Sequence, residues 1–249
     1  MLLRTLFGVL SLAALAAPAR AADPDALWKI VHGRCVPDEQ AHSDPAPCAI
    51  VDMAGGDAVL KDIVGATQFL LIPTTRVGGI ESPEILAPDA PDYWGEAWAA
   101  RHLVEGRAGH DLPRDVLSLA INAVTGRTQD QLHIHIDCVR PDIRDALHAA
   151  LPAIGATWSP VPGGLAGHPY RAMRVDQAEL AGVDPFRLLH DDKTAAADMA
   201  HETLVVVGAQ FANGKGGFIL LADQADLLRG DRGSGEELQD HSCAVARAP

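Results

Sequence analysis

The sequence predicts an α+β fold in which a mainly antiparallel sheet is flanked by helices and followed by a C-terminal hairpin. Short apolar runs bounded by glycine or proline, which are typical of strands, alternate with segments of helical periodicity. None of these runs leads into a glycine-rich dinucleotide-binding loop, which argues against a parallel nucleotide-binding sheet. Residues 203–224 hold two apolar runs on either side of Asn213–Gly217 and therefore predict the hairpin.

Residues 1–22 have the pattern of a targeting segment. Arg4 precedes the apolar run Leu6–Ala17, and Ala19–Ala21 is a small-x-small cleavage site. The run is shorter than the roughly 20 residues that a membrane-spanning helix needs. We expect a cleaved signal peptide or an uncleaved N-terminal membrane anchor, and export to the periplasm or to the periplasmic face of the inner membrane. Residues 23–249 then form a single catalytic domain with a C-terminal extension.

The four cysteines, Cys35, Cys48, Cys138 and Cys243, agree with export, because an even number in an oxidising compartment predicts two disulfides. Four cysteines allow three pairings. Cys35 with Cys48 is the local choice, and it leaves Cys138 to bind Cys243 in the C-terminal tail. The alternative is a zinc site of four thiolates, but no pair has the short ligand spacing that such sites favour.

The charge balance is acidic, with 20 basic and 33 acidic residues. No basic stripe interrupts it, so the phosphate backbone of a nucleic acid would be repelled. We therefore expect no nucleic-acid partner. A phosphorylated ligand could bind only at a local positive pocket. The sequence shows no self-complementary face, so it does not predict an oligomeric state.

Helices are predicted where apolar residues recur at helical spacing or where proline stands in a first turn, as Pro113 and Pro141 do. These segments are 25–32, 93–106, 112–124, 141–151 and 184–200. Apolar runs bounded by glycine or proline predict strands at 48–53 and 67–73. We expect loops at 35–48, 74–92 and 152–175, the last of which could border the active cleft.

The strand expected at 131–139 carries the most informative pattern. Side chains on a strand alternate between its faces. Gln131, His133, His135 and Asp137 therefore share one face, and the aliphatic residues between them pack into the core on the other. A solvated strand face would favour Thr, Lys or Glu, so the two imidazoles indicate a functional site.

Three interpretations of this face compete. His133 and His135 could bind zinc in a metal-dependent hydrolase, with Asp137, His168 or His241 as a third ligand. They could instead be hydrogen-bonded structural residues, for example in a periplasmic nucleotide-binding protein without turnover. The third interpretation, which we favour, is nucleophilic attack on phosphorus by one neutral imidazole while the other transfers a proton.

The segment around this strand, "INAVTGRTQDQLHIHI", resembles the signature of the histidine-triad superfamily. In that family an Asn precedes a turn with a small hydroxyl residue, and three alternating histidines follow on a strand. Asn122 and Thr128 stand at the first two positions, and Gln131, His133 and His135 at the alternating ones. Gln131 thus replaces the first histidine. The resemblance implies a histidine-triad-like version of the α+β fold.

The chain is more similar to one exported branch of that superfamily, the CDP-diacylglycerol pyrophosphatases. The similarity is carried by "WKIVHGRCVP", "GRTQDQLHIHIDCVRPD", "DPFRLL", "GGFILLADQADLL" and "EELQDHSC", which span nearly the whole mature sequence. It implies hydrolysis of the liponucleotide CDP-diacylglycerol to CMP and phosphatidic acid at the membrane surface. The implied mechanism uses no cofactor and no metal ion.

The resemblance also implies residue roles. His133 attacks the phosphorus bonded to cytidine and forms a cytidylyl-histidine, while His135 binds a phosphoryl oxygen and assists the leaving group. Asn122, Thr128 and the amides of the turn at 127–129 hold phosphate oxygens. Gln131 keeps the capacity to donate and accept hydrogen bonds.

Three further residues are candidates for the site, two because of their charge and one because of its expected closeness to the active strand. Arg127 and Arg140 could neutralise the two phosphates, or could instead pair at the surface with Asp130 and Asp142. A Cys138–Cys243 disulfide would bring His241 near the active strand, so His241 is a further candidate for a functional role.

Overall fold

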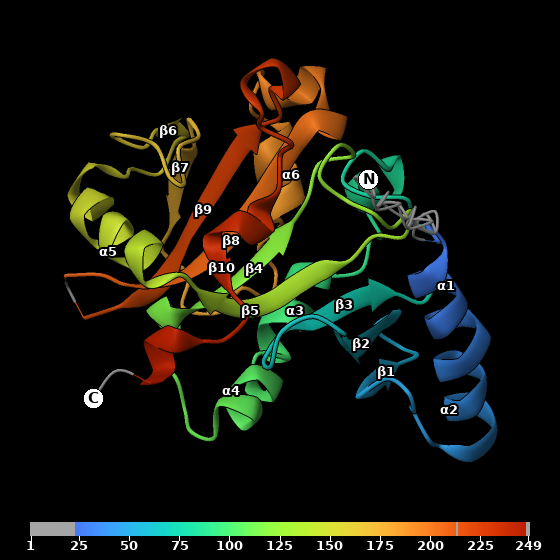
Figure 1. Ribbon diagram of the computed structural model, residues 1–249. Helices are drawn as coiled ribbons and strands as arrows, with labels where there is room; N and C mark the ends of the chain where they lie inside the picture. The colour runs from blue at the N-terminus through green and yellow to red at the C-terminus, as the bar shows by residue number, and fades with distance from the viewer. Residues whose placement is uncertain (1–22, 213, 248–249) are drawn as a thin grey trace, which may run out of the picture.

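The computed structural model describes residues 23–212 and 214–247, and its centre is a ten-stranded antiparallel sheet (Figure 1). The predicted α+β fold is confirmed. The strands are β1 (Ile50–Asp52), β2 (Asp57–Lys61), β3 (Phe69–Pro73), β4 (Leu117–Ile121), β5 (Ile134–Val139), β6 (Ser159–Pro160), β7 (Arg171–Val175), β8 (Glu202–Gln210), β9 (Gly216–Gln224) and β10 (Gln239–Asp240). None of the helices in the described ranges has the length and apolar character to cross a membrane. The predicted leader, residues 1–22, lies outside the described residues.

Strand β5 occupies the middle of the sheet, whose order is β1-β2-β3-β5-β4-β8-β9-β7-β6. One edge of β5 pairs with β4. The other edge pairs first with β3 and then, near its C-terminal end, with β10, which returns from the end of the chain. In this register His135 lies opposite Leu70 of β3 and Ala120 of β4.

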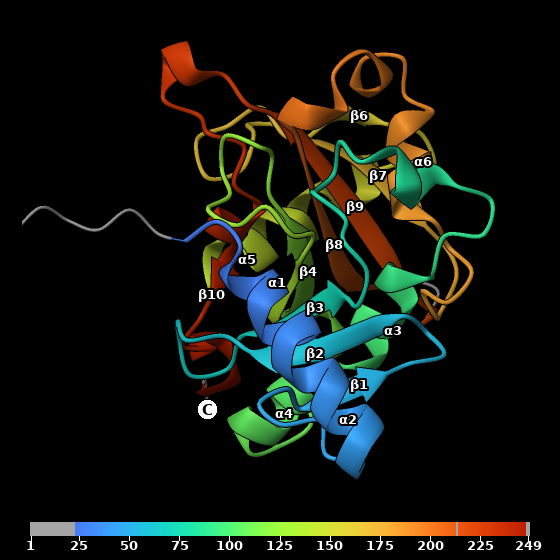
Figure 2. The same ribbon diagram turned by 90° about the vertical axis from the view of Figure 1, so that its right-hand side faces the viewer.

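Helices cover both faces of the sheet, and they leave a gap on one of them. The helices are α1 (Ala26–Ile30), α2 (Val36–His42), α3 (Tyr93–Ala99), α4 (His102–Ala108), α5 (Pro141–Ala150) and α6 (Pro185–His190). α3, α4 and α6 pack on one face. On the opposite face α1 and α2 cover β2 and β3, and α5 covers the part near β8 and β9 (Figures 1 and 2).

The predicted alternation along β5 and the residues just before it is confirmed. Leu132, Ile134 and Ile136 are buried in the core that contains α3 and α4. His133 and His135 point to the other face, into the gap between the α1–α2 layer and α5. The histidines are therefore held by a strand whose apolar face is fully packed, which fixes the orientation of their rings.

The helix predicted at 112–124 is wrong. Residues 117–121 form β4, preceded by a single 3-10 turn at Arg114–Val116. All five residues of β4 are buried, because the strand lies between β5 and β8 with both of its faces covered. An apolar run buried on both faces has no period that distinguishes a strand from a helix.

Other predictions are confirmed, with corrections at the boundaries. The hairpin at 203–224 is β8 and β9, and the helices at 93–106 and 141–151 form as α3–α4 and α5. The first half of the loop expected at 35–48 is instead helix α2, which continues directly from a π-helical turn at Val31–Cys35. The helix expected at 184–200 ends at His190, and β2 was not predicted. Residues 152–175 contain β6 and β7 at the far end of the sheet, and none of them lines the histidine pocket.

Both predicted disulfides form. Cys35 and Cys48 close a short loop beside α2, with Cα atoms 5.7 Å apart. Cys138, in β5, bonds Cys243 across 105 residues of sequence, with Cα atoms 5.2 Å apart. The second bond anchors the end of the chain to the strand that carries His135.

We predict that the two disulfides differ in their effect on stability. In the chain-entropy description, a 105-residue loop contributes about 5 kcal/mol and a 13-residue loop about 3 kcal/mol. The double variant Cys138→Ser, Cys243→Ser should therefore lower the free energy of unfolding in urea more than Cys35→Ser, Cys48→Ser does. A larger loss of unfolding free energy in the Cys35→Ser, Cys48→Ser variant would contradict the assignment of the Cys138–Cys243 disulfide as the main covalent anchor.

Candidate active site

The pocket between the two helical layers contains both histidines. It has a volume of about 300 Å³, and its polar lining comes from β5, the turn after β4 and the C-terminal segment. Its apolar lining comes from α1 and from the loop between β2 and β3. A larger hollow of about 530 Å³ beside α6 has no histidine in its lining.

His133 is oriented by a backbone carbonyl. Its Nδ1 lies 2.7 Å from the oxygen of Gln131, and because a carbonyl only accepts, Nδ1 carries the proton. The lone pair is therefore on Nε2. Burial lowers the pKa of His133, although the bond to Gln131 and the charge of Glu236 oppose this effect. The ring is neutral near pH 7 and has a free nucleophilic nitrogen.

His135 has the opposite tautomer. Its Nδ1 lies 2.8 Å from Nε2 of Gln68, which also donates to the Glu236 carboxylate at 3.2 Å. Since the carboxylate only accepts, the amide nitrogen is the donor to both groups, and the His135 proton lies on Nε2. That nitrogen is buried and faces Oε1 of Glu236 at 3.2 Å, without the alignment of a regular hydrogen bond. Burial, followed by the neighbouring His133 and His241 rings, lowers the pKa of His135 well below 6.5.

The two imidazoles are therefore complementary. Their ring centroids lie 4.8 Å apart in an edge-to-face arrangement. His133 offers a lone pair and His135 offers an N–H donor. One can form a bond to an electrophilic atom while the other stabilises or protonates an oxygen on the same atom.

Glu236 is the main site residue that the sequence analysis missed. Its Oε1 accepts from Asn122 Nδ2 at 2.6 Å and lies 3.2 Å from His135 Nε2. The segment that carries Glu236 packs directly on the sheet, because a Cβ at Gly235 would lie 2.7 Å from Val205 and 3.2 Å from Ala120. Glycine thus permits the close approach that places this carboxylate between the amide of β4 and the histidine of β5.

The turn after β4 forms another wall of the pocket, as predicted for Asn122 and Thr128. The turn is held by the C-terminal segment: the Ala123 amide donates to the Gly233 carbonyl at 2.8 Å. A Cβ at Gly126 would lie 2.5 Å from that same carbonyl oxygen, so glycine is required here too. The amide of Arg127 donates to the Ala123 carbonyl and is part of the turn itself.

Gln131 is fully buried beside the pocket and does not line it. Its Nε2 donates to the carbonyls of Pro73 and Thr75, and its Oε1 accepts from the Val77 amide at 3.4 Å. Its side chain therefore fixes the segment that leaves β3, while its backbone carbonyl orients His133.

The two predicted arginines lie in different places. Arg127 lines the pocket, but its guanidinium is bound by Glu81 through two bonds of 2.6 Å and lies 3.7 Å from Asp130. Arg140 follows the opposite end of β5, where it binds Asp142, and it does not line the pocket. The structure therefore does not bring Arg140 together with the histidines.

Lys61 is a second pocket cation, which the sequence analysis did not identify. Its Nζ donates to the carbonyls of Asp62 and Gly65, at 2.7 and 3.1 Å. Burial lowers its pKa, and the charge of Arg107 acts in the same direction. Because its bonds go to neutral oxygens, its charge remains available to a negatively charged ligand.

His241 does approach the active strand. Its Nδ1 lies 2.8 Å from the buried Asp137 carboxylate, which also accepts from Thr67 at 2.7 Å. The bond to Asp137 raises the pKa of His241. Its other nitrogen lies 3.9 Å from Glu236. Asp137 and His241 thus support the pocket wall from behind and are absent from its lining.

The metal-site alternative predicted His168, Asp137 or His241 as a third ligand beside His133 and His135. Within the described ranges, the group of side chains close enough to share a cation contains His168 with Asp223 and Asp231, and neither pocket histidine. His168 therefore belongs to a different part of the molecule.

We predict that histidine titration separates these rings. In an NMR titration, His133 and His135 should titrate below pH 6.5 and His241 above it. The raised pKa of His241 stabilises the fold below pH 6.5, and this contribution is lost as the pH rises through the folded-state value. Glu236→Gln should lower the pKa of both His133 and His241, since the removed charge raises both. A His133 pKa above 6.5 would contradict the assignment of a buried ring that is neutral near pH 7.

Comparison with known proteins agrees with these features. Residues 22–247 match the family model described as CDP-diacylglycerol pyrophosphatase. The chain is also 43% identical over 245 residues to the CDP-diacylglycerol pyrophosphatase of Yersinia pestis, covering 98% of this chain and 93% of that protein. The chain therefore belongs to the CDP-diacylglycerol pyrophosphatase family.

Proposed function

We propose that this protein hydrolyses the pyrophosphate bond of CDP-diacylglycerol to CMP and phosphatidic acid through a cytidylyl-histidine on His133. The activity follows from family membership and from the relative of the same name. The observation that carries the covalent step is the tautomer of His133, whose Nδ1–H is bound to the Gln131 carbonyl and whose Nε2 is free.

In the first step, Nε2 of His133 attacks the phosphorus bonded to cytidine. A P–N bond forms, and the P–O bond to phosphatidate breaks. His135 Nε2–H lies on the same side of the sheet, 3.2 Å from Oε1 of Glu236, and in the complex it donates to the departing or a non-bridging oxygen. Dividing the displacement into two steps gives each a lower barrier than direct attack by water.

In the second step, water attacks the same phosphorus, the P–N bond breaks and its electron pair returns to Nε2 of His133. The water gives its proton to solvent and CMP leaves, while His135 keeps its Nε2 proton and continues to bind a phosphoryl oxygen. Glu236 acts as a positioning residue, because its carboxylate holds Gln68 and Asn122 around the ring. Asn122 and Thr128 are placed to contact phosphate oxygens, and Lys61 supplies positive charge, whereas the charge of Arg127 is largely offset by Glu81.

The diacylglycerol part of the substrate requires an apolar exit. The loop between β2 and β3 exposes Ile63 fully and Val64 by half, and both line the pocket mouth beside Leu27 and Ile30 of α1. We place the acyl chains along this apolar rim, with the rim in contact with the membrane. Large exposed aliphatic side chains at the mouth of a lipid site support this arrangement.

Export supports the same location. The leader-like pattern of residues 1–22 and the two disulfides are typical of a protein that works outside the cytoplasm. We propose that the protein acts in the periplasm or at the periplasmic face of the inner membrane.

We predict that His133→Ala lowers CMP release by at least about a thousandfold while the fold is retained, because no other group replaces the nucleophile. Circular dichroism checks the fold, and His110→Ala, at an exposed loop position, is the matched control. Base-quenched wild-type enzyme should carry cytidylate on His133 by mass spectrometry. Cytidylate on the His133→Ala protein would show that the nucleophile lies elsewhere.

We also predict that Ile63→Ser acts on lipid delivery and leaves the chemistry unchanged. The apparent KM for CDP-diacylglycerol in vesicles should rise about tenfold, because one buried aliphatic side chain is worth roughly 1.5–3 kcal/mol. kcat/KM for the soluble analogue CDP-glycerol should stay within about twofold. Met53→Ser, at another exposed apolar position, is the control. Equal losses on both substrates would refute contact between this rim and the membrane.

A further inference from the structure

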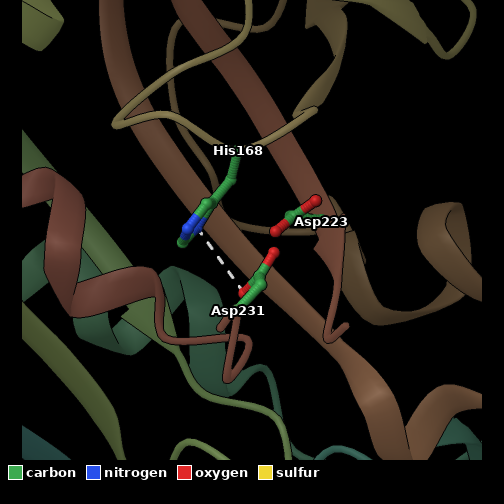
Figure 3. A group of neighbouring side chains, drawn as sticks. All are labelled: His168, Asp223 and Asp231. Atoms are coloured by element: carbon green, nitrogen blue, oxygen red, sulfur yellow. Dashed lines mark ion pairs between the residues drawn. The ribbon is translucent and has the colours of Figure 1, made fainter. Parts of the chain in front are cut away.

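A second cluster of ionisable side chains lies outside the catalytic pocket. Asp223 is in β9, Asp231 follows the 3-10 turn Leu227–Arg229, and His168 is in the turn before β7 (Figure 3). Potential ligand atoms of the three side chains lie within 4.8 Å of one another. Three segments that are distant in sequence thus place one imidazole and two carboxylates around a common point.

Each of the two buried aspartates of this cluster has one oxygen without a hydrogen-bond partner among the described residues. Asp223 is 2% exposed and Asp231 3% exposed, and Oδ2 of each has no hydrogen-bond partner among the described residues. Glu237 adds a third carboxylate, with Oε1 2.9 Å from His168 Nδ1. In residues 23–212 and 214–247, no lysine or arginine forms an ion pair with any of these carboxylates. Buried carboxylates are normally paired with a cation or bound to a metal.

We propose that His168, Asp223 and Asp231 bind a divalent cation, and that this cation is Zn²⁺. One imidazole nitrogen and two carboxylate oxygens form a ligand set that suits zinc, with water completing the coordination. Ca²⁺ and Mg²⁺ favour sites made only of oxygen. The proposal does not depend on the reaction at His133.

The cluster is accessible to an ion. A pocket of about 340 Å³ includes His168 and Asp231 in its lining, together with three glycines of the loop at 163–167. Arg229 lies at this pocket but is paired with Asp226 at 3.3 Å and is directed to solvent. The pocket therefore gives an ion a route from solvent to His168 and Asp231.

The cation would fix the segment that completes the catalytic pocket. Asp231 Oδ1 accepts from the Gly233 amide at 2.8 Å, and the Gly233 carbonyl binds Ala123 in the turn after β4. Glu236 and Glu237 follow in the same segment. We therefore assign the site a structural role. It is best tested by the number of Zn²⁺ ions bound per chain and by the effect of Zn²⁺ on the stability of the fold.

A proton shared by the two aspartates is the competing explanation. Burial, together with the bond to Asp231 and its charge, raises the pKa of Asp223 to about 8. A shared proton would satisfy one oxygen pair without any ion. The two explanations make opposite predictions for zinc binding.

The test is calorimetric titration of chelator-treated, untagged protein with ZnCl₂. Wild type and His133→Ala should each bind one Zn²⁺ per chain, which excludes the catalytic histidines as the ligands. Asp231→Asn should weaken binding at least tenfold, and Asp226→Asn, at the rim of the same pocket, should bind as wild type does. Zn²⁺ should raise the unfolding temperature of wild type and leave that of Asp231→Asn unchanged.

Asp223→Asn and His168→Gln are independent test variants if Asp231→Asn does not fold. Each should bind Zn²⁺ at least tenfold more weakly than wild type does. MgCl₂ and CaCl₂ should bind at least tenfold more weakly than ZnCl₂. Absence of zinc binding by wild type, or undiminished binding by a folded variant of any of the three ligands, would overturn the proposal. Tighter binding of Ca²⁺ than of Zn²⁺ would overturn the assignment of the ion.

Discussion

The hydrogen bond from His133 Nδ1 to the Gln131 carbonyl is the interaction on which the proposed catalytic arrangement depends. It leaves the lone pair on Nε2, in a ring that burial keeps neutral. The carbonyl can hold this position because the Gln131 side chain is itself bonded to three backbone groups in the segment after β3. A glutamine at the first alternating position thus has a positioning role through its backbone and a structural role through its side chain.

The catalytic pocket is assembled from opposite ends of the chain. The first helix supplies an apolar wall, β4 and β5 supply the amide and the imidazoles, and the segment after β9 supplies Glu236. The last contribution depends on small residues, because Gly235 contacts the sheet and Gly233 contacts the turn after β4. The disulfide between Cys138 and Cys243 holds the end of this segment against β5.

Sequence reasoning located the strand of the histidines because its two faces differ in chemistry. It failed for β4, whose faces are both buried, so that the polar alternation that reveals β5 is absent. It also failed for Glu236, because a glutamate in "GSGEELQDHSC" resembles a solvated tail. Its contacts with Asn122 and His135 join residues more than 100 positions apart, which no local pattern contains. Arg140 was proposed from its closeness in sequence, but the strand carries it to the opposite end of β5.

The return of β10 to the edge of β5 has a consequence for biogenesis. Residues 233–243 hold the turn after β4, supply a carboxylate to the pocket and close the longer disulfide. The pocket therefore lacks its Glu236 wall until the chain has been synthesised beyond this segment, and its covalent anchor forms only when Cys138 and Cys243 are oxidised.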